Sequence, residues 1–150
     1  MLKKKIKIYT DGACRGNPGI GGWGASLNYN GTCKEICGGE LDTTNNRMEM
    51  TAVIEALKVL KESSDVCLLS DSQYVLKGIN EWMPNWKKRN WKTASRKPVK
   101  NVDLWQQIDT LMQQHDIEWV WVKGHSGDLG NERADALANQ GIDELIGAYE

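Results

Sequence analysis

The dipeptide Asn30-Gly31 stands between two strand-like segments and constrains the fold of this chain more than any other feature. Both positions of a two-residue hairpin turn need positive φ, which Asn and Gly adopt most readily. The flanking segments lie at 21–27 and 32–40, and a third segment with alternating apolar residues precedes them at 5–10. The sequence therefore predicts that the chain begins with a sheet led by a hairpin.

Beyond the hairpin, helical and strand-like apolar spacings alternate. In chain order the expected elements are a helix over 47–61, a buried strand over 66–69, a helix capped within Ser70-Asp71-Ser72 and ended by Pro84, a helix from Asn101, a strand over 117–122, and a short helix over about 132–140. The order βββ-α-β-α-α-β-α predicts a single α/β domain over residues 1–150.

The charges of this chain are segregated along its length, although its net charge is only −1. Residues 1–76 hold nine basic and nine acidic side chains. Residues 77–100 hold eight basic side chains and one acidic one, whereas residues 101–150 hold two basic and ten acidic ones. The total therefore conceals a segment of net +7 followed by one of net −8. A segment this basic suits the phosphates of a nucleic acid.

Three tryptophans, Trp82, Trp86 and Trp91, accompany the basic residues of the segment at about 82–100. Cationic side chains mixed with flat rings suit a phosphate backbone whose sugars or bases pack on the rings. The alternative is a solvated loop whose tryptophans turn into the core, which is the usual nature of a basic run. The density of tryptophans favours nucleic acid, and we expect all three to be exposed on a basic protrusion.

Composition sets the broad class of protein. A charged fraction of 26% and a hydrophobic fraction of 40% exclude wholesale disorder. No apolar run approaches the roughly 20 residues that span a bilayer, and the first residues do not resemble a signal peptide. The four cysteines have no CxxC spacing, so we expect reduced thiols in a cytoplasmic protein without a membrane partner. Residues from about 142 to 150 are expected to form a flexible tail.

Four acidic residues, Asp11, Glu49, Asp71 and Asp135, stand where the surrounding pattern is apolar. Asp11 and Asp71 each follow an expected strand, and open α/β sheets place ligand sites at such strand ends. Glu49 and Asp135 fall near the inward stripes of their helices. The four carboxylates are therefore predicted to converge at one edge of the sheet.

Each acid also has an ordinary explanation as a turn residue, a helix cap or a first-turn acid. Together they need a further one, because gathered like charges repel each other unless a cation lies between them. Hard carboxylate oxygens suit Mg²⁺, with Mn²⁺ as a substitute, better than zinc. Two such ions, about 3.5–4 Å apart, would support phosphodiester hydrolysis.

The two histidines have different surroundings. His115 follows an amphipathic helical stripe and is expected to be a charge at a helix C-terminus. His125 lies in a glycine-containing loop before Asp135, where a neutral imidazole could take or deliver a proton near the metals. The competing interpretation of His125 is an ordinary polar loop residue.

Around these residues the chain resembles the bacterial type 1 ribonuclease H family. The segments that carry the resemblance are Tyr9-Thr10-Asp11-Gly12-Ala13-Cys14-Arg15-Gly16-Asn17-Pro18-Gly19, Thr44-Asn45-Asn46-Arg47-Met48-Glu49, Ser70-Asp71-Ser72-Gln73-Tyr74-Val75, and Gly124-His125-Ser126 with Asn131-Glu132-Arg133-Ala134-Asp135. The resemblance implies a ribonuclease H-like fold, in which helices flank a five-stranded mixed sheet whose first three strands are antiparallel. It also implies endonucleolytic hydrolysis of the RNA strand of an RNA–DNA hybrid, leaving 5′-phosphate and 3′-hydroxyl ends.

Residue roles carry over from the resemblance by position. The catalytic metal-binding acids match Asp11, Glu49, Asp71 and Asp135, and His125 matches a histidine that assists proton movement or product release. The nucleic-acid contacts match Asn17, Asn45, Asn46 and Gln73 on the RNA strand, Thr44 and Asn85 at a DNA phosphate, Trp82 and Trp86 on DNA sugars, and the protrusion cations Lys87, Lys88 and Arg89. Amide side chains both donate and accept, so they suit the 2′-hydroxyls and base edges in a hybrid's minor groove.

Two other functions compete with this one. A module that binds hybrid or double-stranded RNA without catalysis would need no divalent metal, and the presence of all four acids argues against it. A ribonuclease H-like DNA nuclease would prefer duplex DNA, and the Trp-rich protrusion argues against it. We expect a monomer whose partner is an RNA–DNA hybrid.

Overall fold

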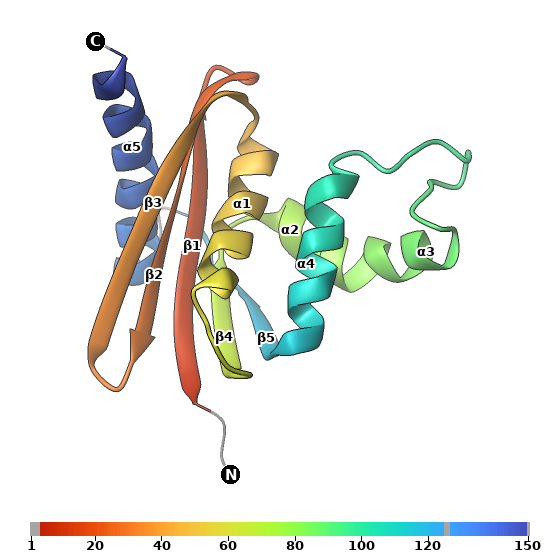
Figure 1. Ribbon diagram of the computed structural model, residues 1–150, viewed down its shortest axis with the longest axis horizontal. Helices are drawn as coiled ribbons and strands as arrows, with labels where there is room; N and C mark the ends of the chain where they lie inside the picture. The colour runs from red at the N-terminus through yellow and green to blue at the C-terminus, as the bar shows by residue number, and fades with distance from the viewer. Residues whose placement is uncertain (1–3, 125–126, 150) are drawn as a thin grey trace.

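A single mixed sheet organises the computed structural model, which describes residues 4–124 and 127–149 (Figure 1). Its strands are β1 (Lys5–Arg15), β2 (Gly19–Tyr29), β3 (Thr32–Thr43), β4 (Asp65–Ser70) and β5 (Asp116–Trp121). They lie in the order β3-β2-β1-β4-β5, with β1, β2 and β3 antiparallel and with β4 and β5 parallel to β1. The predicted five-stranded mixed sheet is confirmed.

Helices cover both faces of the sheet. They are α1 (Asn45–Lys58), α2 (Gln73–Lys77), the π-helical turn η1 (Gly78–Trp82), α3 (Met83–Lys88), α4 (Val102–Gln114) and α5 (Leu129–Ala148). On one face α5 packs against β1, β2 and β3, whereas α1 covers the other face and α4 packs on α1 (Figure 1). Alternation along β2 is consistent with this, because Gly22 faces α5 and the adjacent Gly21 faces α1.

The main hydrophobic core lies between the sheet, α1 and α4. Ile8 of β1, Leu57 of α1, and Trp105 and Ile108 of α4 are all fully buried there. Burying one such side chain contributes about 1.5–3 kcal/mol, so this layer holds α1 firmly on the sheet. Among the described residues, no helix combines the length and the apolar character that a membrane span needs.

The first strand is longer than predicted, because it does not end at Asp11. Antiparallel pairing with β2 continues as far as Arg15, whereas parallel pairing with β4 stops at Thr10. Gly12 does not break the strand; α1 approaches so closely there that a Cβ would collide with the backbone of α1. Asp11 therefore lies at the end of the parallel ladder rather than at the end of the strand.

The predicted helix stop at Pro84 is wrong. The chain stays helical from α2 through η1 into α3, and Pro84 lies in the first turn of α3. Pro84 removes one backbone donor from this helical run, and the run is irregular there because the π-helical turn η1 ends just before α3. Figure 1 shows α3 and the loop after it extending beyond α4, away from the sheet.

The predicted short helix over 132–140, with a flexible tail from 142, is also wrong. The helix α5 begins at Leu129, where the Asp128 side chain accepts a hydrogen bond from the N–H of Asn131, and it continues to Ala148. Gly141, which signals a helix stop, instead lets α5 pack directly on the backbone of Gly38 in β3. Ile142 is fully buried, and its burial extends the helix past the expected end.

Candidate active site

A pocket of about 440 Å³ opens where the parallel pairing of β1 with β4 ends. Its lining residues are Asp11, Gly12, Ala13, Cys14, Asn45, Asn46, Glu49, Asp71, Ser72, Gln73, Tyr74 and Asp135. A larger hollow of about 630 Å³ lies at the opposite ends of β1, β4 and β5, and its described lining includes none of the four predicted acids. We therefore take the smaller, acidic pocket as the candidate active site.

Three of the predicted acids form a close cluster. Asp11, Glu49 and Asp71 each contribute one carboxylate oxygen, and these oxygens lie within 4.8 Å of one another. Asp11 is 5% exposed and Glu49 is 9% exposed, so little water screens their charges. Such a cluster is unstable in its fully ionised form unless protons or cations neutralise it.

The electrostatics of the cluster agree with that requirement. Burial raises the pKa of Asp11, and its hydrogen bond with Glu49 and the charges of Glu49 and Asp71 raise it further. Burial also raises the pKa of Glu49, although a hydrogen bond from Asp11 opposes the effect. At neutral pH and without a cation, the Asp11 carboxyl therefore keeps its proton and donates it to Glu49. A bound divalent cation would displace that proton.

Local structure explains how two of these acids reach the pocket. Asp71 directly follows β4, next to the point where Asp11 leaves the parallel ladder. Glu49 lies near the start of α1, where it accepts a hydrogen bond from the backbone N–H of Gly12. The pKa of Glu49 is raised by burial, and a side-chain hydrogen bond with Ser72 partly opposes that rise. Ser72 was not among the predicted site residues, although its position as a helix cap beside Asp71 was visible in the sequence.

The fourth acid, Asp135, lines the same pocket but does not belong to the close cluster. It lies on α5, and its hydrogen bond with Asp11 is one of the causes that raise the pKa of Asp11. The nearby Arg133 donates to both carboxylate oxygens of Glu35 on β3, at 2.5 and 2.7 Å. This pairing links α5 to β3 beside the buried face of the helix, where Ala134 and Ala138 place Asp135 at the pocket.

His125 lies outside the described residues, but an added Cβ on the preceding Gly124 would lie 2.9 Å from Oδ2 of Asp71. The loop that carries His125 therefore begins beside the acidic cluster. His115 is the C-cap of α4, at the predicted helix end, and it is buried there. Its Nδ1 accepts a hydrogen bond from the N–H of Ser64 at 3.2 Å.

The amide residues predicted to contact RNA gather around the pocket. Asn45, Asn46 and Gln73 lie along its wall, where Asn46 and Gln73 are exposed. Asn17 lies beside them, because its side-chain oxygen accepts a hydrogen bond from the N–H of Asn45 at 3.1 Å. Thr44 is the N-cap of α1 and accepts from a backbone N–H of that helix at 3.2 Å. These residues therefore form one polar surface next to the acids.

The three tryptophans of the protrusion are half-buried, so the prediction that they are exposed is wrong. The ring centroids of Trp82 and Trp86 are 5.8 Å apart, and Trp86 lies 5.6 Å from the fully buried Trp105 of α4. Trp91 also packs against the main core. Large rings stabilise the base of a protrusion when they pack on the core, and only their remaining surface is available to a ligand.

The protrusion residues differ in their availability. The Lys87 ammonium lies 2.9 Å from the carboxylate of Asp109 on α4, so it ties α3 to the body of the protein. Lys88 and Arg89 are exposed, and Arg89 also lines a hollow of about 460 Å³ within the protrusion. Asn85 is exposed on α3, outside the lining of the acidic pocket.

Comparison with known proteins identifies the family of this chain. The RNase H family model matches residues 3–143. Ribonuclease H of Methylobacillus flagellatus is 63% identical over 147 residues, which are 98% of this chain and 97% of that protein. Ribonuclease HI of Pseudomonas aeruginosa is 62% identical over 143 residues, covering 95% of this chain and 97% of the relative.

Solved structures show the same fold. LC9-RNase H1, described as a type 1 RNase H with the type 2 active-site motif, superposes with a TM-score of 0.87 at 32% identity, over 96% of this chain and 74% of that one. LC11-RNase H1, solved in complex with an RNA/DNA hybrid, has a TM-score of 0.74 at 26% identity. The match covers 94% of this chain and 99% of LC11-RNase H1. The predicted ribonuclease H-like fold is confirmed. This chain belongs to the ribonuclease H family, a family of hydrolytic endonucleases.

Proposed function

We propose that this protein hydrolyses the RNA strand of RNA–DNA hybrids and leaves 5′-phosphate and 3′-hydroxyl ends. The observation that carries the proposal is the cluster of Asp11, Glu49 and Asp71 in one pocket with the exposed amides of Asn46 and Gln73. Clustered carboxylates suit metal-assisted phosphodiester hydrolysis, and amides beside them suit the 2′-hydroxyls of RNA. The RNA/DNA hybrid in the solved structure of LC11-RNase H1 supports the choice of substrate.

The proposed cofactor is Mg²⁺, with Mn²⁺ as a substitute and two ions present when substrate is bound. The donor set fits a hard cation, because it consists of three carboxylates within 4.8 Å and a fourth, from Asp135, in the same pocket. Burial raises the pKa of Asp11 and that of Glu49, and the charges of neighbouring carboxylates raise both further. A bound cation would stabilise the ionised forms. When bound, the cations would supply Lewis-acid stabilisation to the attacking and leaving oxygens of the phosphodiester.

Residues of the chain perform the other parts of the reaction. Asp11, Glu49, Asp71 and Asp135 would hold the cations, and the N–H of Gly12 orients the Glu49 carboxylate. His125 takes or delivers a proton during the reaction, or assists the departure of product. Its place in the chain, one residue after Gly124, supports this role because Gly124 lies close to Asp71.

The substrate contacts divide between the two strands of the hybrid. Proposed contacts are Asn17, Asn45, Asn46 and Gln73 to the RNA strand, Thr44 and Asn85 to a DNA phosphate, Trp82 and Trp86 to DNA sugars, and Lys87, Lys88 and Arg89 to the backbone beyond. Lys88 and Arg89 are the stronger candidates among the cations, since Lys87 already pairs with Asp109. Such contacts recognise the shape of a hybrid and its 2′-hydroxyls without reading sequence.

We also propose that the protein works as a monomer in the cytoplasm. Its four cysteines are free thiols, as a reducing compartment favours. Sedimentation equilibrium with and without a hybrid would measure the mass of the free protein and of the complex. A monomer and a complex containing one protein per short hybrid are expected.

A cleavage assay with matched duplexes tests the proposed function. A labelled RNA strand paired with DNA is compared with RNA–RNA and DNA–DNA duplexes, with and without Mg²⁺. We expect the protein to cut the RNA strand of the hybrid, and to cut it only when Mg²⁺ is present. A polymerase should be able to extend the products from their 3′ ends. Binding of the hybrid without cleavage would indicate a binding module, and a preference for DNA–DNA would indicate a DNA nuclease.

A further inference from the structure

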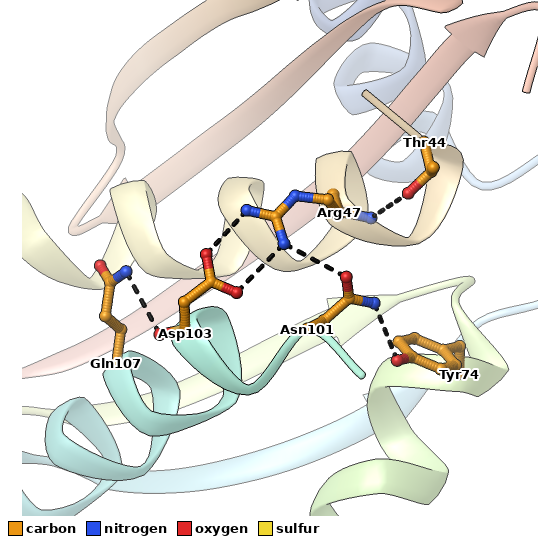
Figure 2. Close-up of polar contacts among 6 residues, drawn as sticks. All are labelled: Thr44, Arg47, Tyr74, Asn101, Asp103 and Gln107. Carbon is orange, nitrogen blue, oxygen red and sulfur yellow. Dashed lines mark hydrogen bonds and ion pairs between the residues drawn. The ribbon is translucent and has the colours of Figure 1, made fainter. Parts of the chain in front are cut away.

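A polar network joins the start of α1 to the start of α4 (Figure 2). The guanidinium of Arg47, on α1, donates to both carboxylate oxygens of Asp103 at 3.1 and 2.8 Å and to the side-chain oxygen of Asn101 at 3.2 Å. Paired hydrogen bonds between guanidinium and carboxylate fix orientation as well as distance. The network therefore holds the exit of the basic protrusion, which ends at Asn101, against α1.

Asn101 occupies an uncommon conformation for its position. It is the N-cap of α4, but its backbone is left-handed, with φ 60° and ψ 28°, and no N–H of this fully described helix bonds to its side chain. A capping hydrogen bond stabilises a helix, and the Asn101 side chain gives up that stabilisation. Instead its oxygen accepts from Arg47, and its amide nitrogen donates to the Tyr74 hydroxyl at 3.0 Å (Figure 2).

Tyr74 connects this network to the other end of the protrusion. Its ring lies 5.6 Å from that of Trp82 in an edge-to-face arrangement, and 5.4 Å from that of Trp105. Trp82 is where the protrusion begins, and Asn101 is where it returns to the body. A single tyrosine therefore contacts both ends of the segment, one through its ring and the other through its hydroxyl.

The same network reaches the acidic pocket. Arg47 lies between Asn46 and Glu49 on the first turns of α1, and Tyr74 directly follows Gln73 and itself lines the pocket. The two residues that anchor the protrusion are thus close in the chain to residues proposed to bind metal and RNA.

We propose that Arg47, Asn101 and Tyr74 form a clamp that sets the position of the basic protrusion relative to the acidic pocket. A hybrid long enough to touch both surfaces binds tightly only when their separation matches its helical geometry, because preorganisation reduces the cost of ordering on binding. The three are positioning residues, which act on substrate affinity through the protrusion cations. This inference rests on the proposed function, in which the protrusion docks the hybrid.

The test uses Asn101→Gly, which removes the side chain and keeps the backbone, since glycine adopts positive φ without strain and is accepted at an N-cap. The matched control is Asn30→Gly, the same substitution at another left-handed residue (φ 48°) in the β2–β3 turn. On a long hybrid we expect Asn101→Gly to raise KM about fivefold, with kcat within about twofold of wild type. The control is expected to leave both constants unchanged.

A double-mutant cycle identifies the route of the effect. Asn101→Gly is combined with Lys88→Ala and Arg89→Ala, which remove exposed cations of the protrusion. If the clamp acts through the protrusion, Asn101→Gly raises KM by less than about twofold in that background. Tyr74→Phe, which removes only the hydroxyl that accepts from Asn101, is expected to give the same non-additive result, and it guards against a folding defect in Asn101→Gly.

Specific outcomes would overturn the inference. An equal rise in KM in both backgrounds would show that the network acts independently of the protrusion, as would a fall in kcat without a change in KM. If Lys88→Ala with Arg89→Ala leaves KM unchanged, the protrusion does not dock the hybrid. The proposed clamp is then wrong as well, because it acts through the protrusion. If the wild-type protein does not cut the hybrid, the proposed function itself is wrong, so the failures are distinguishable.

Discussion

Glu49 on α1 accepts a hydrogen bond from the backbone N–H of Gly12 on β1, the residue after Asp11. Helix and strand meet here without an intervening side chain. A Cβ at residue 12 would collide with the backbone nitrogen of Glu49 and the carbonyl carbon of Met48. The close approach brings two of the clustered carboxylates together, and it explains why a glycine occupies a strand interior where it would otherwise be unfavourable.

Replacing Gly12 with Ala should therefore disrupt the cluster. The added methyl group must push α1 away from β1, at a cost of about 1–3 kcal/mol in the free energy of unfolding, as for other overpacked sites. We also expect weaker Mg²⁺ binding, because Glu49 moves away from Asp11. Urea denaturation and calorimetric metal titration measure the two effects. Gly147→Ala is the matched control, since nothing lies within 4 Å of its added Cβ; equal behaviour of the two variants would contradict the account.

The stability of the metal-free protein should depend on pH in a predictable direction. Burial raises the pKa of Asp11, and it raises that of Glu49 to about 7. At pH values above the ordinary pKa of a carboxyl group, the folded protein therefore binds more protons than the unfolded chain does. The free energy of unfolding should then fall as pH rises from about 4 toward 7. Added Mg²⁺ should reverse the loss by binding the folded state.

Asp11→Asn provides the variant for this pH experiment. It removes the carboxyl group that must take up a proton when the metal-free chain folds, so we expect a flatter pH dependence. The unfolding free energy at neutral pH should be higher by on the order of 1 kcal/mol in the absence of metal. Urea midpoints across this pH range, with a chelator and then with Mg²⁺, measure the effect. A metal-free wild-type protein that gains stability as pH rises through this window would refute the electrostatic argument.

The exposed cations of the protrusion should govern the salt dependence of hybrid binding. Lys88→Ala with Arg89→Ala should raise KM more than it lowers kcat, because the interaction is made equally with substrate and transition state. The slope of log K against log salt should flatten by about 0.7–0.9 for each phosphate that the variant no longer neutralises. A charge-matched control, Lys34→Ala with Lys58→Ala, should keep the wild-type slope. If the protrusion variant keeps the wild-type slope, the protrusion is not the element that docks the hybrid.

The amides around the pocket should affect substrate recognition without affecting metal binding. Asn46 is exposed on the pocket wall. We expect Asn46→Ala to lower kcat/KM on a hybrid by about tenfold, the cost of removing one hydrogen bond to a 2′-hydroxyl or base edge, and to leave Mg²⁺ affinity unchanged. Gln106→Ala, at an exposed amide on α4, is the control. A loss of metal affinity in Asn46→Ala would assign that residue to the metal site instead.

The acidic site was predictable because its signal is local. Asp11 and Asp71 each follow an expected apolar strand, and Glu49 and Asp135 fall near the inward stripes of their helices, so the expected sheet topology already brings them to one edge. Cluster and pocket agree with that expectation, with Asp135 beside the close group rather than within it. Helical and strand periodicity likewise predicted the order of the elements, since both depend on spacing along the chain.

The features that were not predicted depend on contacts between distant segments. Gly141 is read as a helix stop until its contact with Gly38 is known, and Trp86 is read as exposed until Trp105 is placed beneath it. Nothing in the sequence distinguishes Lys87 from Lys88. In the described part of the chain, however, Lys87 pairs with Asp109 on α4, and Lys88 does not. Asn101 is read as a simple helix cap, because nothing local reveals that its side chain bonds to Arg47 and Tyr74.

The central claim is that the clustered carboxylates hold the catalytic metal ions for cleavage of RNA in a hybrid. The most direct measurement compares wild-type and Asp11→Asn proteins for the rate at which a labelled RNA strand in a hybrid is cut in Mg²⁺. We predict that Asp11→Asn folds, binds the hybrid, and cuts it more slowly by about 10²-fold or more, as expected when charge stabilisation of a transition state is removed. Cutting by Asp11→Asn at the wild-type rate would contradict the claim.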